Sequence, residues 1–454
     1  MIAIREDLTP KALETKIRRL FDASAAKIDS IEKSWDSSQP TPVFTVQGRY
    51  TSRGWTEWTQ GFQFGSAILQ FDATGEVRFL ESGRRDTVKY MAPHVSHIGV
   101  HDHGFNNIST YGNLLRLMNE RAIPENAWER EFYQLALKVS GVVQAARWSR
   151  IATGGGYIYS FNGPHSLFVD TIRSLRSLAV SHKLGHVLMG ENDSRISLLG
   201  RLIDHAQATA RFSIYYGEGR DYYDVRGRTA HESIFNVNDG NYRCPNSQQG
   251  FSPFTTWTRG LAWAMCGFAE QLEFIASVPD GELEEFGGRS TVERMMRRAA
   301  EATCDFYIDY SPTDGIPYWD TGAPRLHRLG DWAGRRSDPF NSFEPIDSSA
   351  AAIAVQGLLR LGKYADNRRY LQAGLTVADA LFDEPYLSTN PDHQGLILHA
   401  VYHRPNGWDA APLADGVPRG EACMWGDYHA REAALYLLRI MEERPYLRFW
   451  SERT

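Results

Sequence analysis

The stretch Ser160-Phe-Asn-Gly-Pro-His-Ser-Leu-Phe-Val-Asp-Thr-Ile-Arg-Ser-Leu-Arg-Ser-Leu178 combines a helical pattern with an isolated acid, Asp170. After the Gly163-Pro164 break, apolar residues recur at Leu167, Val169, Ile172, Leu175 and Leu178. This spacing is close to the helical period, so it predicts a helix that begins just after Pro164. Patterns of the same kind recur along the rest of the chain, which makes the helix the main element of the expected fold.

Helical periodicity also covers most of the remaining sequence. A first amphipathic helix is predicted at 9–34, and further helices are predicted at about 104–121, 125–149, 165–184, 193–216, 254–276, 289–310, 346–363, 366–383 and 425–443. Residues 41–59 are polar, aromatic and loop-like, and a short apolar segment follows at 61–71. Long stretches rich in Gly, Pro, Asn and Asp separate the helices at 150–164, 217–253, 311–345 and 385–424. Loops of this length in a compact domain are usually functional.

This organisation predicts an all-α protein. A toroid of paired helices, with the long loops forming a cleft at one end, fits the alternation of short and long connections. A right-handed array of helical repeats would fit as well, although the sequence has no fixed period of the kind that such arrays show. No shift in composition marks a linker, so we expect one domain over residues 1–454.

Composition narrows the class of protein. Hydrophobic residues make up 42% and charged residues 23% of the chain, as in ordinary soluble proteins. The formal net charge is −6 and no basic stripe is present, so nucleic acid is an unlikely partner. No segment is long and apolar enough to span a bilayer, and the N-terminus lacks the apolar core of a signal peptide. We therefore expect a cytoplasmic enzyme without a membrane partner.

Two acids in unlike surroundings suggest acid–base chemistry. Asp170 is flanked by Phe168, Val169 and Ile172, and partial burial raises the pKa of a carboxyl group. A second acid, Asp102, lies in the segment His-Asp-His-Gly-Phe that begins at residue 101. Two carboxyl groups with different environments can divide acid and base work. The alternative is that either Asp caps a helix or pairs with an Arg, because structural ion pairs also perturb pKa values.

A second group of polar residues lies between positions 231 and 263. Arg259 and Trp263 are four residues apart, so a helix would place them on one face, where a guanidinium beside an indole offers a carboxylate clamp and a stacking plate. His231 and Gln249 come from the loop that leads to this helix and can supply hydrogen bonds. The alternative is that Trp263 belongs to the core and Arg259 pairs with a neighbouring acid.

Other candidate sites have weaker support. His101 and His103 have the spacing of a metal pair, but no further ligand of matching type lies nearby in the sequence. The four cysteines are scattered, without disulfide or zinc spacing: Cys244, Cys266, Cys304 and Cys423. Asp347 is expected to cap the helix that follows it. We therefore expect neither a metal nor a nucleotide cofactor.

Six motifs occur in an order that is characteristic of one enzyme family. They are His101-Asp102-x-Gly104-Phe105, Asp170-Thr-x-x-x-Leu175, Gln249-Gly-Phe-Ser…Trp257-x-Arg259-Gly-x-Ala-Trp263, Ile316-Pro-Tyr-Trp-Asp320, Glu344-Pro-x-Asp347-Ser-Ser-Ala-Ala-Ala352 and Gly426-Asp-Tyr428. Over roughly residues 60–440, the chain resembles the unsaturated glucuronyl hydrolases, glycoside hydrolase family 88.

The resemblance implies an (α/α)6 barrel, which requires one or two helices beyond those predicted above, within 61–71 or 385–424. It also implies an unsaturated oligosaccharide substrate that ends in a Δ4,5-unsaturated uronate. Apart from the resemblance, we expect a monomer or a homodimer. By motif, Asp170 corresponds to the general acid/base and Asp102 to its partner acid. The residues implied to bind substrate are His101, His231, Gln249, Arg259 and Trp263.

The chain departs from the family pattern beside the implied site. Gln63 stands where the family usually has a Trp, for which Trp55 or Trp58 would have to substitute. His103 replaces an aliphatic residue, and Arg173-Ser174 replaces Met-Asn. These differences leave two alternatives open: another reaction on a sugar, such as hydrolysis of a saturated glycoside or isomerisation, and a non-catalytic carbohydrate-binding barrel.

The implied reaction explains why a sheltered aspartic acid would be needed. The substrate is a vinyl ether, so hydration requires a proton at C4 and water at C5. One carboxyl group can give the proton and then accept a proton from the attacking water, unlike ordinary glycosidases, which use two carboxyl groups. Burial and the like charge of Asp102 would both raise the pKa of Asp170, and the two acids would titrate as a pair.

Overall fold

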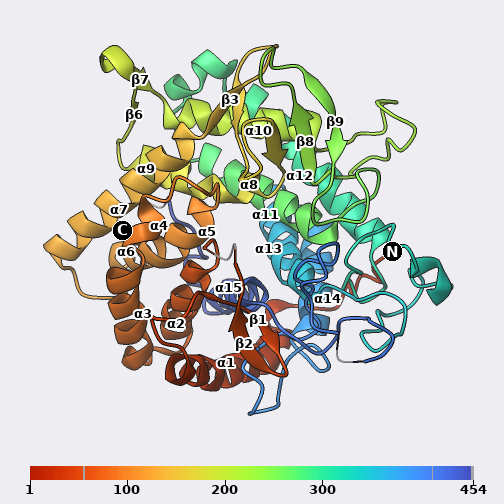
Figure 1. Cartoon of the computed structure of the whole chain (residues 1–454). Coiled ribbons are helices and arrows are strands. Elements are labelled where there is room, and N and C mark those ends of the chain that lie inside the picture. The colour runs from red at the N-terminus through yellow and green to blue at the C-terminus, as the bar shows by residue number, and fades with distance from the viewer. Residues whose placement is uncertain (55–56, 412, 451–454) are drawn as a thin grey trace.

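The protein is a ring of helices with loops and short strands at one end (Figure 1). The computed structural model describes residues 1–54, 57–411 and 413–450. Within these residues, six inner helical positions alternate along the chain with six outer ones. Helices dominate and strands are short, which confirms the prediction of an all-α protein with the (α/α)6 arrangement.

The inner helices are buried on nearly all sides. They are α2 (Gln60–Thr74), α5 (His103–Asn107) with α6 (Asn113–Asn119), α8 (Thr171–Ser174) with α9 (Arg176–Lys183), α11 (Thr258–Ile275), α13 (Ser348–Tyr364) and α15 (Met424–Met441). A π-helical turn, Ile108–Gly112, joins α5 to α6. Every residue of α11 is buried, which a helix achieves only when neighbours surround it.

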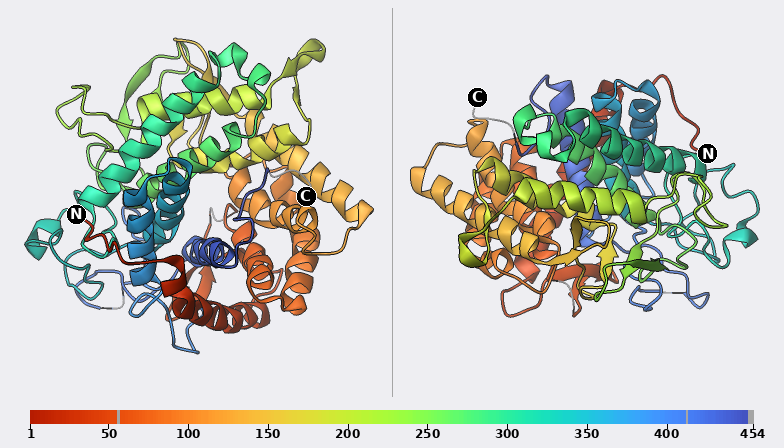
Figure 2. Two further views of the ribbon diagram at one scale, coloured as in Figure 1. Left: turned by 180° about the vertical axis from the view of Figure 1, so that it is seen from behind. Right: turned by 90° about the horizontal axis from the view of Figure 1, so that it is seen from above.

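The outer helices bury one face only. They are α1 (Glu14–Ser34), α3 (Val77–Tyr90), α7 (Ala127–Ala146), α10 (Leu198–Phe212), α12 (Arg289–Tyr310) and α14 (Arg368–Leu381). A short helix, α4 (Ala92–Val95), precedes α5. The ring closes because α1, near the start of the chain, packs against both α2 and the last helix, α15 (Figures 1 and 2).

Short antiparallel strands accompany the loops. They are β1 (Pro42–Val46), β2 (Arg49–Ser52), β3 (Trp148–Arg150), β4 (Gly156–Ile158), β5 (Ser166–Phe168), β6 (Leu188–Met189), β7 (Arg195–Ile196), β8 (Glu232–Phe235) and β9 (Tyr242–Asn246). β1 pairs with β2, and β8 lies between β5 and β9. In the right-hand view of Figure 2 these two sheets lie towards one end of the ring.

Three details differ from the sequence prediction. No helix starts just after Pro164, because Ser166–Phe168 forms β5 and pairs with β8, so the helix begins only at Thr171. Residues 42–52 form a hairpin rather than a loop, although Trp55 lies outside the described residues. Of the helices needed to complete the barrel, α2 covers 61–71 as expected, whereas the described part of 385–424 contains none and α3 is the other.

Helix α3 was missed because its sequence is mostly polar. An outer helix needs apolar contacts on one face only, and α3 buries Phe79, Leu80, Gly83 and Thr87 among charged neighbours. Two of these buried residues, Gly83 and Thr87, are not large apolar residues and do not add to a hydrophobic pattern. The periodicity of large apolar side chains in α3 is therefore too weak to predict a helix.

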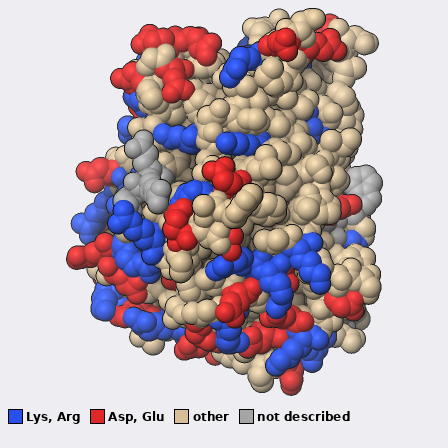
Figure 3. Space-filling view, turned by 90° about the vertical axis from the view of Figure 1, so that its left-hand side faces the viewer, with Lys and Arg blue, Asp and Glu red and all other residues tan. Residues whose placement is uncertain are grey.

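On the face shown in Figure 3, acidic and basic side chains are interspersed. No helix of the described residues has both the length and the apolar character that crossing a bilayer would require. The largest apolar cluster draws residues from Ile2 to Trp450, which is compatible with one domain, but the domain boundaries stay a prediction.

Candidate active site

The β5–β8 pairing positions the first catalytic candidate. Phe168 pairs with Glu232, and the amide of Val169 donates to the carbonyl of His231 at 2.9 Å. Asp170 follows directly and precedes α8, so the strand end holds it next to His231. The sheet thus brings together two segments that lie about sixty residues apart in the sequence.

Both candidate acids stand just before a helix, yet neither caps it. Asp102 precedes α5 and Asp170 precedes α8, and no side-chain cap hydrogen bond forms at either position. The ion-pair partner of both carboxyl groups is His101 rather than an Arg. The structural alternatives considered for these two acids, helix capping and pairing with an Arg, are therefore wrong.

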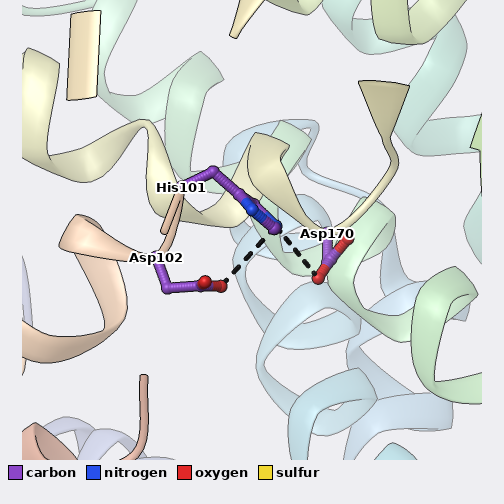
Figure 4. A group of neighbouring side chains, drawn as sticks. All are labelled: His101, Asp102 and Asp170. Carbon is purple, nitrogen blue, oxygen red and sulfur yellow. Dashed lines mark ion pairs between the residues drawn. The ribbon is translucent and has the colours of Figure 1, made fainter. Parts of the chain in front are cut away.

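His101 lies between the two acids (Figure 4). Its Nε2 is 3.7 Å from Asp102 Oδ1 and 3.7 Å from Asp170 Oδ2. Phe161 stacks on the imidazole, and Phe168 meets it edge-on. Neither ring nitrogen of His101 has a hydrogen-bond partner within the protein, and Oδ1 of Asp170 also lacks one. Buried polar atoms without partners are uncommon, and they mark this trio as a place where a ligand or water completes the bonding.

The pKa values of the two acids move in opposite directions. Burial raises the pKa of Asp102 to about 6. Burial also raises the pKa of Asp170, but the neighbouring His101 outweighs it, and the pKa of Asp170 is lowered. The expectation that Asp170 carries a raised pKa in the free protein is therefore wrong. For His101, burial lowers the pKa, but the two carboxylates outweigh this effect and raise it.

The same trio has the spacing of a metal site. One ligand atom from each of the three residues lies within 4.8 Å of the others, and they form the group in the described residues that is close enough to hold a metal ion. The metal pair considered from the sequence was His101 with His103. The two ring nitrogens of His103, however, contact Ser140 Oγ and the carbonyl of His97. His103 is thus engaged in the core, and a metal would have to use one histidine and two carboxylates.

A cavity of about 600 Å³ opens beside the two acids. Its lining is mainly aromatic, with a few polar groups: Trp58, Asp102, Phe105, Phe161, Asp170, Gln248, Gln249, Trp257, Arg259, Trp263, Tyr402, His403 and Trp408. Pockets that combine apolar walls with a few polar groups and perturbed pKa values are the usual location of an active site. Of the predicted site residues, His101 and His231 are not among the lining residues, but each directly precedes or contacts one that is: His101 lies between Asp102 and Asp170, and Nδ1 of His231 accepts from Gln248 and Gln249.

His231 is held as a neutral hydrogen-bond donor. Its Nδ1 accepts from the backbone amides of Gln248 at 3.0 Å and Gln249 at 3.3 Å. Burial lowers the pKa of His231 to about 4, so the ring is uncharged at neutral pH. Because Nδ1 accepts two hydrogen bonds, the ring proton lies on Nε2, and Nε2 has no partner in the protein.

Arg259 is buried, lines the cavity and hydrogen-bonds to three other segments of the chain. Its guanidinium donates to Asp347 Oδ2 at 2.9 Å, Gln249 Oε1 at 2.9 Å and the carbonyl of Tyr402 at 2.7 Å. The alternative in which Arg259 pairs with a neighbouring acid is therefore confirmed. Asp347 also caps α13 as predicted, since its side chain accepts from the amide of Ser349.

The aromatic partners of Arg259 differ from the prediction. The guanidinium carbon of Arg259 lies 4.6 Å from the ring centroid of Trp257 and 4.9 Å from that of Trp425. Trp263 instead packs against Phe105 and His429. Trp263 is 2% exposed, so it combines a core position with a place in the cavity wall. The side-by-side clamp of Arg259 and Trp263 inferred from their spacing is not the geometry observed.

The departures from the family pattern have structural explanations. Trp58 lines the cavity and packs against Trp425 at 4.9 Å, as expected of a substitute for a missing indole. Gln63 bonds to Gln60 and lines a different cavity. Arg173 does not reach the cavity, because it forms buried ion pairs with two glutamates, Glu270 and Glu432.

Sequence reasoning missed part of the cavity wall. Tyr402, His403 and Trp408 come from the long loop at 385–424, which was expected to be functional but had no residue singled out. Phe161 and Trp257 were also missed. The signal that would have found Trp408 is a large aromatic side chain in a polar loop beside Asp409, whose carboxylate accepts from the amide of Tyr402.

Comparison with known proteins gives similar proteins by sequence and by fold. No family model matches the chain. An unsaturated glucuronyl hydrolase from Formosa agariphila is 24% identical over 382 residues, which are 83% of this chain and 79% of that protein. One from Bacillus sp. strain GL1 is 25% identical over 420 residues, which are 89% of this chain and 91% of that protein.

The chain is similar to the unsaturated glucuronyl hydrolases. The crystal structure of an unsaturated glucuronyl hydrolase specific for heparin superposes with a TM-score of 0.71 and 17% identity, and the match covers 95% of this chain and 98% of that one. This likeness concerns the fold, since the identity is low. The fold and the family resemblance inferred from six short motifs are therefore confirmed, and the roles of the individual site residues stay predictions.

Proposed function

We propose that the protein removes a Δ4,5-unsaturated uronic acid from the non-reducing end of an oligosaccharide by hydrating its C4=C5 double bond. The observation that carries this proposal is the group of Asp102, His101 and Asp170 beside a cavity with aromatic walls. The names of the related proteins, unsaturated glucuronyl hydrolases, support the same reaction. The retained pair of acids speaks against a purely carbohydrate-binding barrel.

Asp170 is the proposed acid and base. Its carboxyl group gives a proton to C4, and positive charge develops at C5 and the ring oxygen. Water then adds to C5 and loses a proton to the Asp170 carboxylate, which restores the acid. The hemiketal product opens and releases the remaining sugar. Each step uses groups of this chain and the substrate, and none is routed through a metal.

The acid proton has to reach Asp170 when substrate binds, because its pKa is lowered in the free protein. The uronate carries its own carboxylate, and a negative charge that enters the cavity raises the pKa of a neighbouring carboxyl group. His101, whose pKa is raised, lies between the two acids and keeps a proton close to both. Substrate binding thus converts the resting carboxylate of Asp170 into the acid that the first step needs.

The cavity walls supply recognition. The aromatic rings, among them Trp58 and Trp408, offer faces for a sugar ring. The Nε2–H of His231 and the side-chain NH2 group of Gln249 are the polar donors proposed for the substrate oxygens. Arg259 is occupied by protein partners, so we assign it to holding Gln249 in place and to the positive potential of the cavity.

The test is the loss of ultraviolet absorbance of the conjugated double bond when an unsaturated disaccharide is added. Wild type should remove the signal, and Asp170→Asn should slow the reaction by about 10²–10⁴-fold, the usual contribution of a positioned proton donor. Asp204→Asn, at a partly buried carboxyl outside the cavity, should retain wild-type activity.

Other outcomes would point elsewhere. Conversion of a sugar with the double bond intact would favour isomerisation or hydrolysis of a saturated glycoside, and binding without turnover would favour a carbohydrate-binding role. Full activity in Asp170→Asn would remove the proposed mechanism. A monomer or homodimer as the oligomeric state and a cytoplasmic location stay predictions.

A further inference from the structure

Ser174 connects the two segments that carry the catalytic acids. It is the last residue of α8, four positions after Asp170, and it is completely buried. Its hydroxyl donates to the carbonyl of His101 at 2.8 Å and accepts from the amide of Gly104 at 2.9 Å. A hydroxyl group has one donor and two acceptor positions, and the side-chain amide of Gln144 fills the remaining one at 2.9 Å.

Gln144 reinforces the connection from a third element. This residue belongs to the outer helix α7, and its side-chain amide donates at 2.7 Å to the same His101 carbonyl that Ser174 contacts. The Ser177 hydroxyl donates in turn to Oε1 of Gln144, which fixes the orientation of the amide. The backbone on either side of Asp102 is therefore held at two points, residues 101 and 104.

The two segments also touch backbone to backbone. A Cβ atom added to Gly104 would lie 2.0 Å from the carbonyl oxygen of Ser174, a distance that backbone atoms cannot accommodate. The backbones of Gly104 and Ser174 are therefore in direct contact. The spacing of Asp102 and Asp170 thus depends on direct contacts between α8 and the segment 101–104.

The groups proposed to recognise substrate are held by other contacts. Arg259 and Gln249 bond to each other, and Arg259 bonds to Asp347 at the start of α13. None of the hydrogen bonds described for Ser174 or Gln144 involves these residues. A change at Ser174 should therefore act on the acids while leaving the recognition groups in place.

We propose that Ser174 is a positioning residue that fixes Asp102 and His101 relative to Asp170. This inference rests on the proposed hydration reaction. It also gives a role to one of the departures from the family pattern, the serine of Arg173-Ser174. A displacement of about 1 Å between reacting groups can lower a rate about 10²-fold, so a single buried hydroxyl can control turnover.

The experiment compares Ser174→Ala with Ser181→Ala. Ser181 is a matched control, because it is also a buried serine on the inner layer and donates to the carbonyl of Lys138 on α7, away from the acids. In Ser174→Ala, kcat for loss of the double bond should fall about 10–100-fold with little change in KM, and the pH profile should shift. Ser181→Ala should keep the wild-type kcat and profile.

A second readout separates this inference from the proposed function. The imidazole of His101 can be titrated by nuclear magnetic resonance without substrate, and its pKa should move towards 6.5 in Ser174→Ala because the two carboxylates lose their fixed positions. A wild-type kcat and an unchanged His101 titration in this variant would overturn the inference. If wild type itself proves inactive, the proposed function fails, and the His101 titration still decides the role of Ser174.

Folding does not limit the test. If Ser174→Ala does not fold, Ser174→Cys keeps a similar side-chain volume with a weaker donor and should give a smaller loss of kcat in the same direction. A merely structural role would lower the melting temperature of both variants and leave kcat, the pH profile and the His101 titration as in wild type.

Discussion

At the scale of single residues, the two acids differ in what surrounds them. Asp102 has a pKa raised to about 6, because burial disfavours its charge. Asp170 is buried as well, but its lowered pKa reflects the histidine beside it. The acid with the raised pKa is therefore the predicted partner, not the predicted proton donor. The raised pKa of Asp102 costs stability at neutral pH, whereas the lowered pKa of Asp170 does not, so Asp102 is the acid whose burial stability does not explain.

Asp102→Asn should make the folded protein more stable at pH 7. A raised carboxyl pKa means that the folded state binds the proton more tightly than the unfolded state, so wild type loses stability as the pH rises from about 4 to 6 and does not regain it above. The shift from 3.8 to about 6 corresponds to at most about 3 kcal/mol. Urea denaturation of wild type and Asp102→Asn at pH 7 and pH 4 measures the difference in their free energy of unfolding.

The gain in stability of Asp102→Asn over wild type should be nearly absent at pH 4. At that pH the Asp102 carboxyl group of wild type is protonated in the folded state and about half protonated in the unfolded state. Activity should fall in the same variant. A destabilised Asp102→Asn protein at pH 7 would show that the Asp102 carboxylate is favourably bonded, contrary to the pKa shift.

At the scale of elements, Arg259 joins three parts of the ring. It lies in the first turn of α11, pairs with Asp347 at the start of α13, and donates to backbone carbonyls at residues 401 and 402. Both charged groups are buried, so the pair satisfies groups that water cannot reach. Spacing within one helix could not reveal this, since the partners come from distant segments.

Arg259→Ala should destabilise the fold, and it should not act on substrate binding alone. Removing one member of a buried ion pair leaves the other charge without a partner, which typically costs about 3–5 kcal/mol. The free energy of unfolding from chemical denaturation measures this loss. As a control, Arg297→Ala removes an Arg whose side chain is 51% exposed and pairs with Glu301 on the same helix, so the loss of stability should be smaller. A stable Arg259→Ala protein with a raised KM would instead favour the original interpretation of a carboxylate clamp.

At the scale of the whole molecule, charged groups fill part of the barrel interior. Arg173 pairs with Glu270 at 2.8 Å and with Glu432 at 2.9 Å, and Arg360 pairs with Glu273 at 2.7 Å. These residues come from α8, α11, α13 and α15, and all of them are buried. The inner helices are therefore joined by ion pairs as well as by apolar contacts.

Glu432→Gln should destabilise the protein by about 3–5 kcal/mol at pH 7, since Arg173 would lose a buried partner. For Glu432, burial raises the pKa, but the two nearby guanidinium groups outweigh it and hold the pKa well below the ordinary value of 4.5. A lowered carboxyl pKa adds stability above 4.5, and this contribution is lost as the pH falls towards the folded pKa.

The melting temperatures of wild type and Glu432→Gln should therefore approach each other on acidification below pH 4.5. Glu442→Gln is the surface control: Glu442 pairs with Arg444 at 3.2 Å in a partly exposed position, and its loss should cost about 0–1 kcal/mol. Equal melting temperatures of wild type and Glu432→Gln at pH 7 would show that the interior pair contributes nothing.

The sequence predicted some helices closely and others poorly, and the difference does not follow the inner and outer layers of the barrel. The pattern at 289–310 agrees with α12 at both ends, because large apolar residues repeat on one face. Helix α3 was missed, since its buried face includes Gly83 and Thr87. The start of α8 was placed too early, because pairing of Ser166–Phe168 with β8 is a contact between distant segments that local periodicity does not register.

The site was predictable from motifs, but its electrostatics were not. Asp102 and Asp170 were found because each lies in a short motif, and the structure brings them to the same histidine. The charge state of Asp170 depends on where the His101 ring points, which is a three-dimensional fact. The walls at Tyr402 and Trp408 lie in a loop whose sequence has no regular pattern.

The cavity takes its acids from residues 102 and 170, and most of its remaining polar and aromatic lining from 248–263 and 402–408. The proposed reactive groups and most of the surfaces proposed to contact the sugar therefore come from different segments of the chain. A different oligosaccharide preference can arise by exchange of the 402–408 loop, with the proton-transfer groups left untouched. Engineering of selectivity should begin with loops grafted at 402–408.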